Sequence, residues 1–167
     1  MMKIISAIRP ISPWRALFRR ALVSGGAAAV ASATVAAQCA RAEGTTAAAP
    51  MNAVTHSVWP REGARATRPS LRHTVTGFAI HTCASIFWAT GFEALRARQA
   101  KPTLADDLAT AALVSAAAWC VDYHVVPARL TPGFEEHLGD RSMLLVYGAI
   151  AAGFLAAARI QRRSASA

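Results

Sequence analysis

Histidine and aspartate residues lie within the long apolar runs of this sequence, at spacings that could support chemistry. The run HTVTGFAIHTCASIFWATGFE, residues 73–93, begins with His73 and contains His81. Asp122 closes another apolar run, and His56 lies in the loop that precedes the first. A carboxylate that orients a histidine can support a proton relay or a metal site. We therefore take His56, His73, His81 and Asp122 as the candidate polar cluster.

The geometry of an unbroken helix limits which cofactors this cluster could hold. His56, His73, Asp122 and His124 together would suit a transition metal. However, His124 points about 160° away from Asp122 on the same helical wheel. A haem with two histidine ligands needs deep histidines on two helices, and only one helix supplies one. We therefore expect no cofactor and commit to no metal site.

Nucleophilic catalysis is also not expected from this sequence. Ser85 or Cys83 would have to lie beside a base, and His81 is four residues from Ser85. A helical serine at this spacing usually bonds to its own backbone instead. The sequence therefore favours a protein that is not an enzyme.

The elements that must position these residues are expected to be membrane helices. Charged residues make up 16% of the 167 residues, whereas a soluble domain has about a quarter. Three runs, residues 21–40, 74–92 and 142–158, contain no charged residue, and about 17–25 apolar residues cross a bilayer as a helix. The fold class is thus all-α, a four-transmembrane-helix bundle. We expect a basic lead-in at 1–20, one membrane domain at 21–163 with helices at about 21–40, 71–95, 103–126 and 142–160, and a short tail at 164–167.

The basic residues predict the orientation of the bundle. The net charge is +9, and lysine and arginine are more frequent in the lead-in, the 96–101 turn and the segment after residue 158 than in the other loops. The positive-inside rule then places both termini in the cytoplasm. The arginines are dispersed between apolar runs rather than gathered on one face, so nucleic acid is not an expected partner. Membrane lipid is.

The first apolar run has a second interpretation. Residues 21–40 are mostly small, and the basic head and Ala40-Arg41-Ala42 also fit a cleavable signal peptide. The run is longer than the usual signal core of about 7–15 residues, so we favour a retained anchor.

Small and polar residues form stripes on three of the predicted helices. On the second, His73, His81 and the small residues share one face at about 100° per residue, as at buried helix interfaces in membranes. His81 lies about 12 Å deeper than His73, while Asp122 should lie at the depth of His73. The residues predicted to pack helices together are Gly77, Ala84, Trp88, Ser115, Trp119 and Gly148.

Several other positions carry structural expectations. Thr103 and Asp106 fit an N-terminal capping box, and Asp106 and Asp107 complement the helix dipole. Glu93 is expected to meet water or Arg96. Residues 50–60 could form a short helix on the membrane surface or an irregular loop. Two cysteines, Cys39 and Cys120, lie near the same end of the bundle and could pair or remain free thiols.

Three segments resemble a family of small bacterial inner-membrane proteins without an assigned activity. These are residues 52–59, SLRHTVTGFAIHTCASIFWA at 70–89 and VDYHVVPARLTPGFE at 121–135. The resemblance covers most of residues 50–160 and implies a four-helix protein of the inner membrane with its first helix retained. Members often carry a second histidine after the position of His81, where this chain has Thr82.

The functional expectation has two forms. The first is a non-enzymatic accessory or scaffold subunit, whose small-residue faces pack against a membrane-protein partner or a second copy. The alternative is a carrier or sensor that responds to protons or a metal ion through His73, His81 and Asp122.

Overall fold

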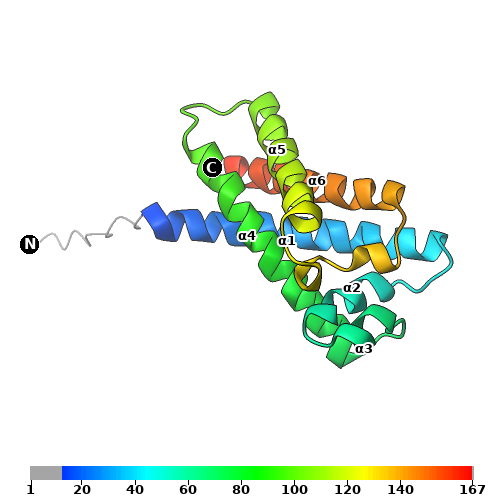
Figure 1. Ribbon diagram of the computed structural model, residues 1–167. Coiled ribbons are helices and arrows are strands. Elements are labelled where there is room, and N and C mark those ends of the chain that lie inside the picture. The colour runs from blue at the N-terminus through cyan, green and yellow to red at the C-terminus, as the bar shows by residue number, and fades with distance from the viewer. Residues whose placement is uncertain (1–12, 167) are drawn as a thin grey trace, which may run out of the picture.

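Four long helices make up most of the computed structural model, which describes residues 13–166 of the chain (Figure 1). They are α1 (Pro13–Ala42), α4 (Thr76–Ala97), α5 (Leu104–His124) and α6 (Asp140–Ser166). No strand occurs in the described part, so the all-α prediction is confirmed. All four helices are long and apolar enough to cross a membrane. The short elements are α2 (Ala49–Ala53), η1 (Val54–Ser57), α3 (Pro60–Arg65), η2 (Leu71–Val75), η3 (Ala128–Leu130) and η4 (Phe134–Glu136).

Two of the long helices extend beyond their apolar runs. α1 starts at Pro13, inside the segment expected to be a lead-in, and proline suits a first helical position because its missing N–H would have no partner there. α6 continues to Ser166, so residues 164–166 of the expected tail belong to the helix. Arginine is a good helix former and reaches water from the end of an apolar helix. Because the prediction ended each helix where charged residues begin, it made α1 and α6 too short.

Small residues allow α1 to pack closely against both α4 and α6. Ala21, Ala28, Ala36 and Ala40 are completely buried. A Cβ atom added to Gly25 would lie 2.5 Å from the Cα of Ile86 in α4. The low apolar content of this run thus has a packing reason, because larger side chains would separate the helices.

α6 uses a different glycine from the predicted one. A Cβ on Gly153 would lie 2.5 Å from the Cα of Ala28, whereas a Cβ on Gly148 would meet nothing within 4 Å. Gly148 is exposed, so its assignment as a packing residue is wrong within this chain. The two glycines are five residues apart, which puts them on opposite sides of a helix.

The 50–60 segment forms short helical turns, α2 and η1, most of which pack into the protein. Residues 49–55 are buried. Asn52 donates to the carbonyl oxygens of Ala66 and Arg68, 2.9 and 3.0 Å away, and accepts from Thr74. A Cβ on Gly77 would clash with the carbonyl oxygen of Met51. Gly77 therefore does pack closely, but against α2 and not against another long helix.

Glu43 connects the end of α1 to the start of α6. Its carboxylate accepts from the Ser142 hydroxyl and, at 2.9 Å, from the Gly139 backbone N–H. These two donors hold the pKa of Glu43 below its ordinary value of 4.5. We call this end of the bundle, where α1 ends and α6 begins, the α2 end.

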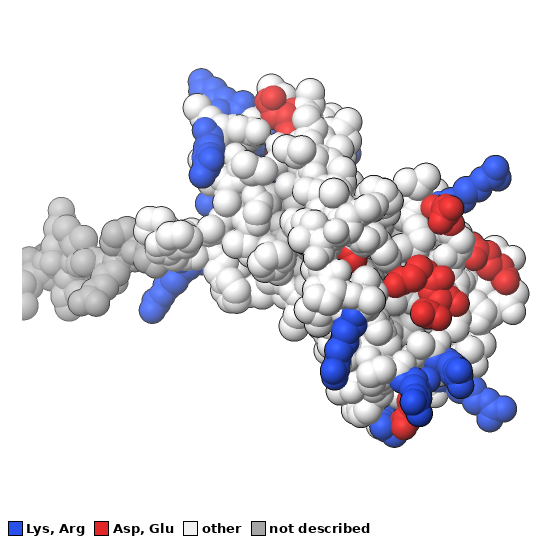
Figure 2. Space-filling model, viewed as in Figure 1, with Lys and Arg blue, Asp and Glu red and all other residues white. Residues whose placement is uncertain are grey.

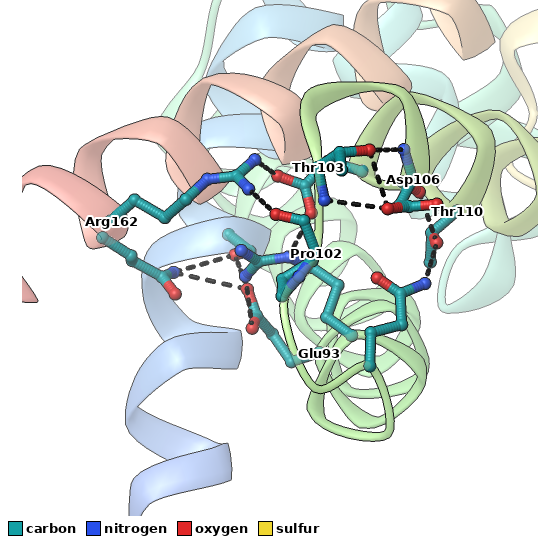
Figure 3. Close-up of polar contacts among 11 residues, drawn as sticks. Glu93, Pro102, Thr103, Asp106, Thr110 and Arg162 are labelled. Atoms are coloured by element: carbon teal, nitrogen blue, oxygen red, sulfur yellow. Dashed lines mark hydrogen bonds and ion pairs between the residues drawn. The ribbon is translucent and has the colours of Figure 1, made fainter.

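A buried ion network connects all four long helices at the opposite end (Figure 3). Arg96 donates to Glu93 at 3.0 Å and to Asp107 at 2.9 Å, and Arg162 pairs with the second oxygen of Asp107. Ser24 of α1 donates to Glu93 at 2.5 Å. The side chains of Glu93 and Asp107 are 0% exposed. The network thus holds two carboxylates and two guanidinium groups, which balance in charge.

The network changes the roles expected for its acidic residues. Glu93 does meet Arg96, but it does not meet water. Thr103 and Asp106 form the predicted capping box, which is confirmed. Asp107 is more than a dipole partner, since it joins α5 to α4 and α6. Each buried ion costs several kcal/mol of desolvation, so a network of this kind is stable only when every charge has a partner.

We predict that Gly153→Ala lowers the melting temperature of the purified protein by several degrees. The added methyl would overpack α6 against α1, at a cost of about 1–3 kcal/mol. Gly148→Ala is the matched control on the same helix and should leave the temperature unchanged or slightly higher. Thermal unfolding in detergent measures both. Equal effects of the two substitutions would contradict the close α1–α6 contact.

We also predict that Asp107→Asn destabilises the protein by about 3–5 kcal/mol, because two buried guanidinium groups would lose their shared carboxylate. Asp106→Asn changes the neighbouring exposed residue and should cost about 1 kcal/mol through the weakened cap. Unfolding by a denaturing detergent would separate the two values. If Asp107→Asn were no worse than Asp106→Asn, the network would not hold the helices together.

Candidate functional site

A cavity of about 170 Å³ lies between the helices towards the α2 end. Its walls come from α4, α5, α6, η1 and the segment 130–134. Most of the lining is apolar, with Ile80, Trp88, Phe134 and Ile150 among the largest side chains. Polar groups are few: His81, Ser85, Asp122, Tyr147, Ser57 and Thr131. An apolar cavity with a few converging polar groups is the usual form of a small-molecule site.

His81 reaches the cavity from α4 and is held in place by α1. Its Nε2 atom lies 2.8 Å from the Ser32 hydroxyl, which itself donates to the Ala28 carbonyl at 2.7 Å. With the hydroxyl hydrogen directed to the Ala28 carbonyl, Nε2 of the neutral imidazole donates to Ser32. Nδ1 is then left as an acceptor. The edge of the ring packs against Phe134, with ring centroids 5.5 Å apart.

Asp122 enters the same cavity from α5. One of its oxygens accepts from the Tyr147 hydroxyl at 2.7 Å. The neighbouring Tyr123 donates to Glu135 at 3.1 Å, and Thr131 donates to the other oxygen of Glu135 at 2.9 Å. Two sets of hydrogen bonds therefore lie at this wall, one between Tyr147 and Asp122 and one from Thr131 and Tyr123 to the exposed carboxylate of Glu135.

Ser85 shares the cavity with His81 but is not linked to it. Ser85 is buried, and its hydroxyl forms no hydrogen bond with His81 or with any other residue in the described part of the chain. The histidine Nε2 already bonds to Ser32. The arrangement therefore lacks the hydroxyl–imidazole contact that an activated serine needs.

The 127–139 segment covers one side of the cavity and is fastened to η1. The His56 ring lies between two carbonyl oxygens, with Nε2 3.1 Å from that of Ala128 and Nδ1 2.9 Å from that of Ala53, and the neutral ring donates to one of them. Arg129 donates to the Ser57 carbonyl at 3.1 Å. Gly133 has a φ of +81° and lies against His56, where a Cβ would not fit. The role of His56 is thus to hold this segment.

The candidate polar cluster does not assemble as one site. His73 bonds to Thr55 at 2.9 Å and packs its ring against Trp59, away from the cavity lining. Of the four residues, only His81 and Asp122 share the cavity. Among the described residues, no group of three or more His, Cys, Asp or Glu side chains could hold a metal ion. His73 contacts Thr55 and Trp59, which precede α4, while Asp122 contacts Tyr147 of α6.

The predicted packing face of α4 turns out to be largely the cavity face. Ala84 and Trp88 line the cavity. The buried residues of α4 are Gly77, His81, Ser85, Ala89, Phe92, Glu93 and Arg96. On α5, Ser115 is buried and donates to the Tyr147 carbonyl at 2.5 Å, whereas Trp119 is 40% exposed. Cys39 and Cys120, for which a disulfide was one expectation, are both free thiols.

Asp122 is the charged group that lines the cavity, and the surface around the α2 end carries charges of both signs. No lysine or arginine occurs among the described lining residues. Figure 2 shows acidic side chains gathered where α1 ends and α6 begins. The exposed acidic residues of this region are Glu43, Glu135, Glu136 and Asp140. Arg41, Arg129 and Arg141 are exposed in the same region, so a preference for positively charged guests would come from the cavity lining and not from the surface around it.

No protein-family model, curated protein or solved structure matches the chain.

Proposed function

We propose that the chain is an integral protein of the bacterial inner membrane, with both termini in the cytoplasm. The four apolar helices and the larger number of basic residues near the ion-network end support this orientation. The cavity then lies in the outer half of the bundle.

Within this frame, we propose that the protein is a non-enzymatic sensor or carrier of a small cationic guest. The observation that carries the proposal is that His81 and Asp122 share a cavity without a lining lysine or arginine. Nδ1 of His81 and the second oxygen of Asp122 are both acceptors. Acceptors without cationic neighbours select a guest that brings donor hydrogens and positive charge.

The size and walls of the cavity favour an organic amine over a metal ion. A cavity of about 150 Å³ is known to hold benzene, so one of about 170 Å³ suits a guest of similar size. Trp88, Phe134 and Tyr147 supply aromatic faces or edges, and cations are attracted to aromatic faces. A metal ion, by contrast, would need more ligands than His81 and Asp122 provide.

We predict that pentylammonium raises the melting temperature of the purified protein with increasing dose, and that 1-pentanol, its neutral counterpart, does so much less. A ligand that binds only the folded state stabilises it. Asp122→Asn should weaken the amine effect at least tenfold, since it removes the charge but can still accept from Tyr147. Thermal shifts at constant ionic strength would measure this.

Glu136→Gln is the matched control for that experiment, because it removes an exposed carboxylate that does not line the cavity. It should leave most of the amine effect intact. Equal stabilisation by amine and alcohol, or full amine binding in Asp122→Asn, would refute the cationic site.

A second proposal, an accessory or scaffold role, is supported by a groove between α4 and α5. The groove has a volume of about 410 Å³ and is lined by Trp88, Gly91, Leu95 and Leu113 among others. A Cβ on Gly91 would meet nothing within 4 Å, so the chain's own packing does not require this glycine. Small exposed residues allow a second helix to approach closely. We propose that a second copy of the chain docks here.

We predict that Gly91→Cys, in a background without native cysteines, forms a disulfide-linked dimer when membranes are oxidised. Gly148→Cys places a thiol on α6 at a position that is equally open, and it should remain monomeric. Non-reducing electrophoresis would show both. A cross-link at 148 but not at 91 would contradict docking through the α4–α5 groove.

A further inference from the structure

A groove of about 720 Å³ opens beside the ion network, between the first turns of α1 and the last turns of α6. Its volume is within the range of about 300–1,000 Å³ that is usual for small-molecule sites. Four of its lining residues are arginines: Arg19, Arg20, Arg96 and Arg162. The cavity described above has no such residue, so the two sites differ in the charge of the ligand they could take.

Two of these arginines are already neutralised within the protein. Arg96 pairs with Glu93 and Asp107, and Arg162 pairs with Asp107. Arg19 and Arg20 are exposed, and neither side chain forms an ion pair or hydrogen bond with another residue of the described chain. The groove therefore carries an excess of positive charge that belongs to Arg19 and Arg20.

The groove lies at the boundary between charged and apolar sequence on both helices. On α1 the uncharged run begins at residue 21, directly after Arg20, and on α6 it ends at residue 158, shortly before Arg162. A bilayer has its headgroups at this level of a spanning helix. The arginines would thus face phosphate groups rather than acyl chains.

Apolar side chains continue from the groove along the outer surface of the helices. Val23 and Ile160 line it and are 45% and 59% exposed, and Phe18 nearby on α1 is 57% exposed. A soluble phosphate compound has no apolar part that would cover such a surface. An acyl chain would cover it, because contact with lipid removes apolar area from water.

From these observations we propose that the groove binds the phosphate headgroup of an anionic phospholipid. Arg19 and Arg20 donate to the phosphate oxygens, as arginine does at phosphate sites because of its planar fork of N–H groups. The acyl chains lie along Val23 and Ile160. Basic pockets between membrane helices are a recurring form of lipid site. This inference does not depend on the amine cavity, which is at the other end of the bundle.

Native mass spectrometry of the full-length protein in detergent would test the proposal, with phosphatidylglycerol, neutral phosphatidylcholine or soluble glycerol 3-phosphate added. The wild type should retain about one phosphatidylglycerol per chain and bind phosphatidylcholine far more weakly. The double variant Arg19→Gln/Arg20→Gln should bind phosphatidylglycerol at least tenfold more weakly, because about 1 kcal/mol of attraction is lost with each basic residue.

Two further variants make the result specific. Arg61→Gln/Arg65→Gln removes two exposed arginines from α3, at the α2 end, and should leave the binding unchanged. Arg19→Lys/Arg20→Lys keeps the charge and should keep most of the affinity, which separates loss of charge from loss of fold.

Three outcomes would overturn the lipid site. The first is equal binding of phosphatidylglycerol and phosphatidylcholine. The second is the same loss of binding in both glutamine double variants. The third is binding of glycerol 3-phosphate as tight as that of the lipid, with competition between them, which would assign the groove to a soluble phosphate compound.

Discussion

The ion network at one end of the bundle is the constraint on which the rest of the structure depends. It takes Ser24 from α1, Glu93 and Arg96 from α4, Asp107 from α5 and Arg162 from α6. Two carboxylates with no exposed surface are tolerable only if both guanidinium groups stay within hydrogen-bonding distance. Sliding or rotating any one helix would leave a buried charge without a partner. The network therefore fixes the relative depth of all four helices, and hydrophobic contact between alanine-rich surfaces alone would not.

That fixed depth explains how the opposite end can accommodate a cavity. The helices approach closely where glycine and alanine meet, as at Gly25 and Gly153. Towards the α2 end, by contrast, bulky Trp88, Phe134 and Tyr147 stand around an empty volume. The 127–139 segment closes this volume through His56 and Arg129, which bond to backbone carbonyls. The contacts that position His81 and Asp122, and those that fasten the 127–139 segment, are all made within the chain and do not require a guest.

The sequence could predict the helices because apolar runs of bilayer length are a strong and local signal. It could predict the cap at Thr103 and Asp106 for the same reason, since capping depends on residues three apart. It could not predict that Asp107, one residue further, bridges two arginines from other helices, because nothing local distinguishes a buried carboxylate from a capping one. The candidate site failed in the same way. His81 and Asp122 do share a cavity, but the contacts of Thr55 and Trp59 with His73 come from a segment whose burial has no periodic signature.

The cavity and the arginine groove lie at opposite ends of the bundle and differ in the sign of the charged side chains that line them. Because the network is neutral, it cancels Arg96 and Arg162 and leaves Arg19 and Arg20 as the excess charge of the groove. At the α2 end, the exposed carboxylates of Glu43 and Glu135 accept hydrogen bonds from Gly139 and Thr131, respectively. The cavity lining has the carboxylate of Asp122 and no lysine or arginine, whereas the groove has two arginines that the network does not neutralise. The two sites therefore differ in the sign of the charge nearest to a ligand.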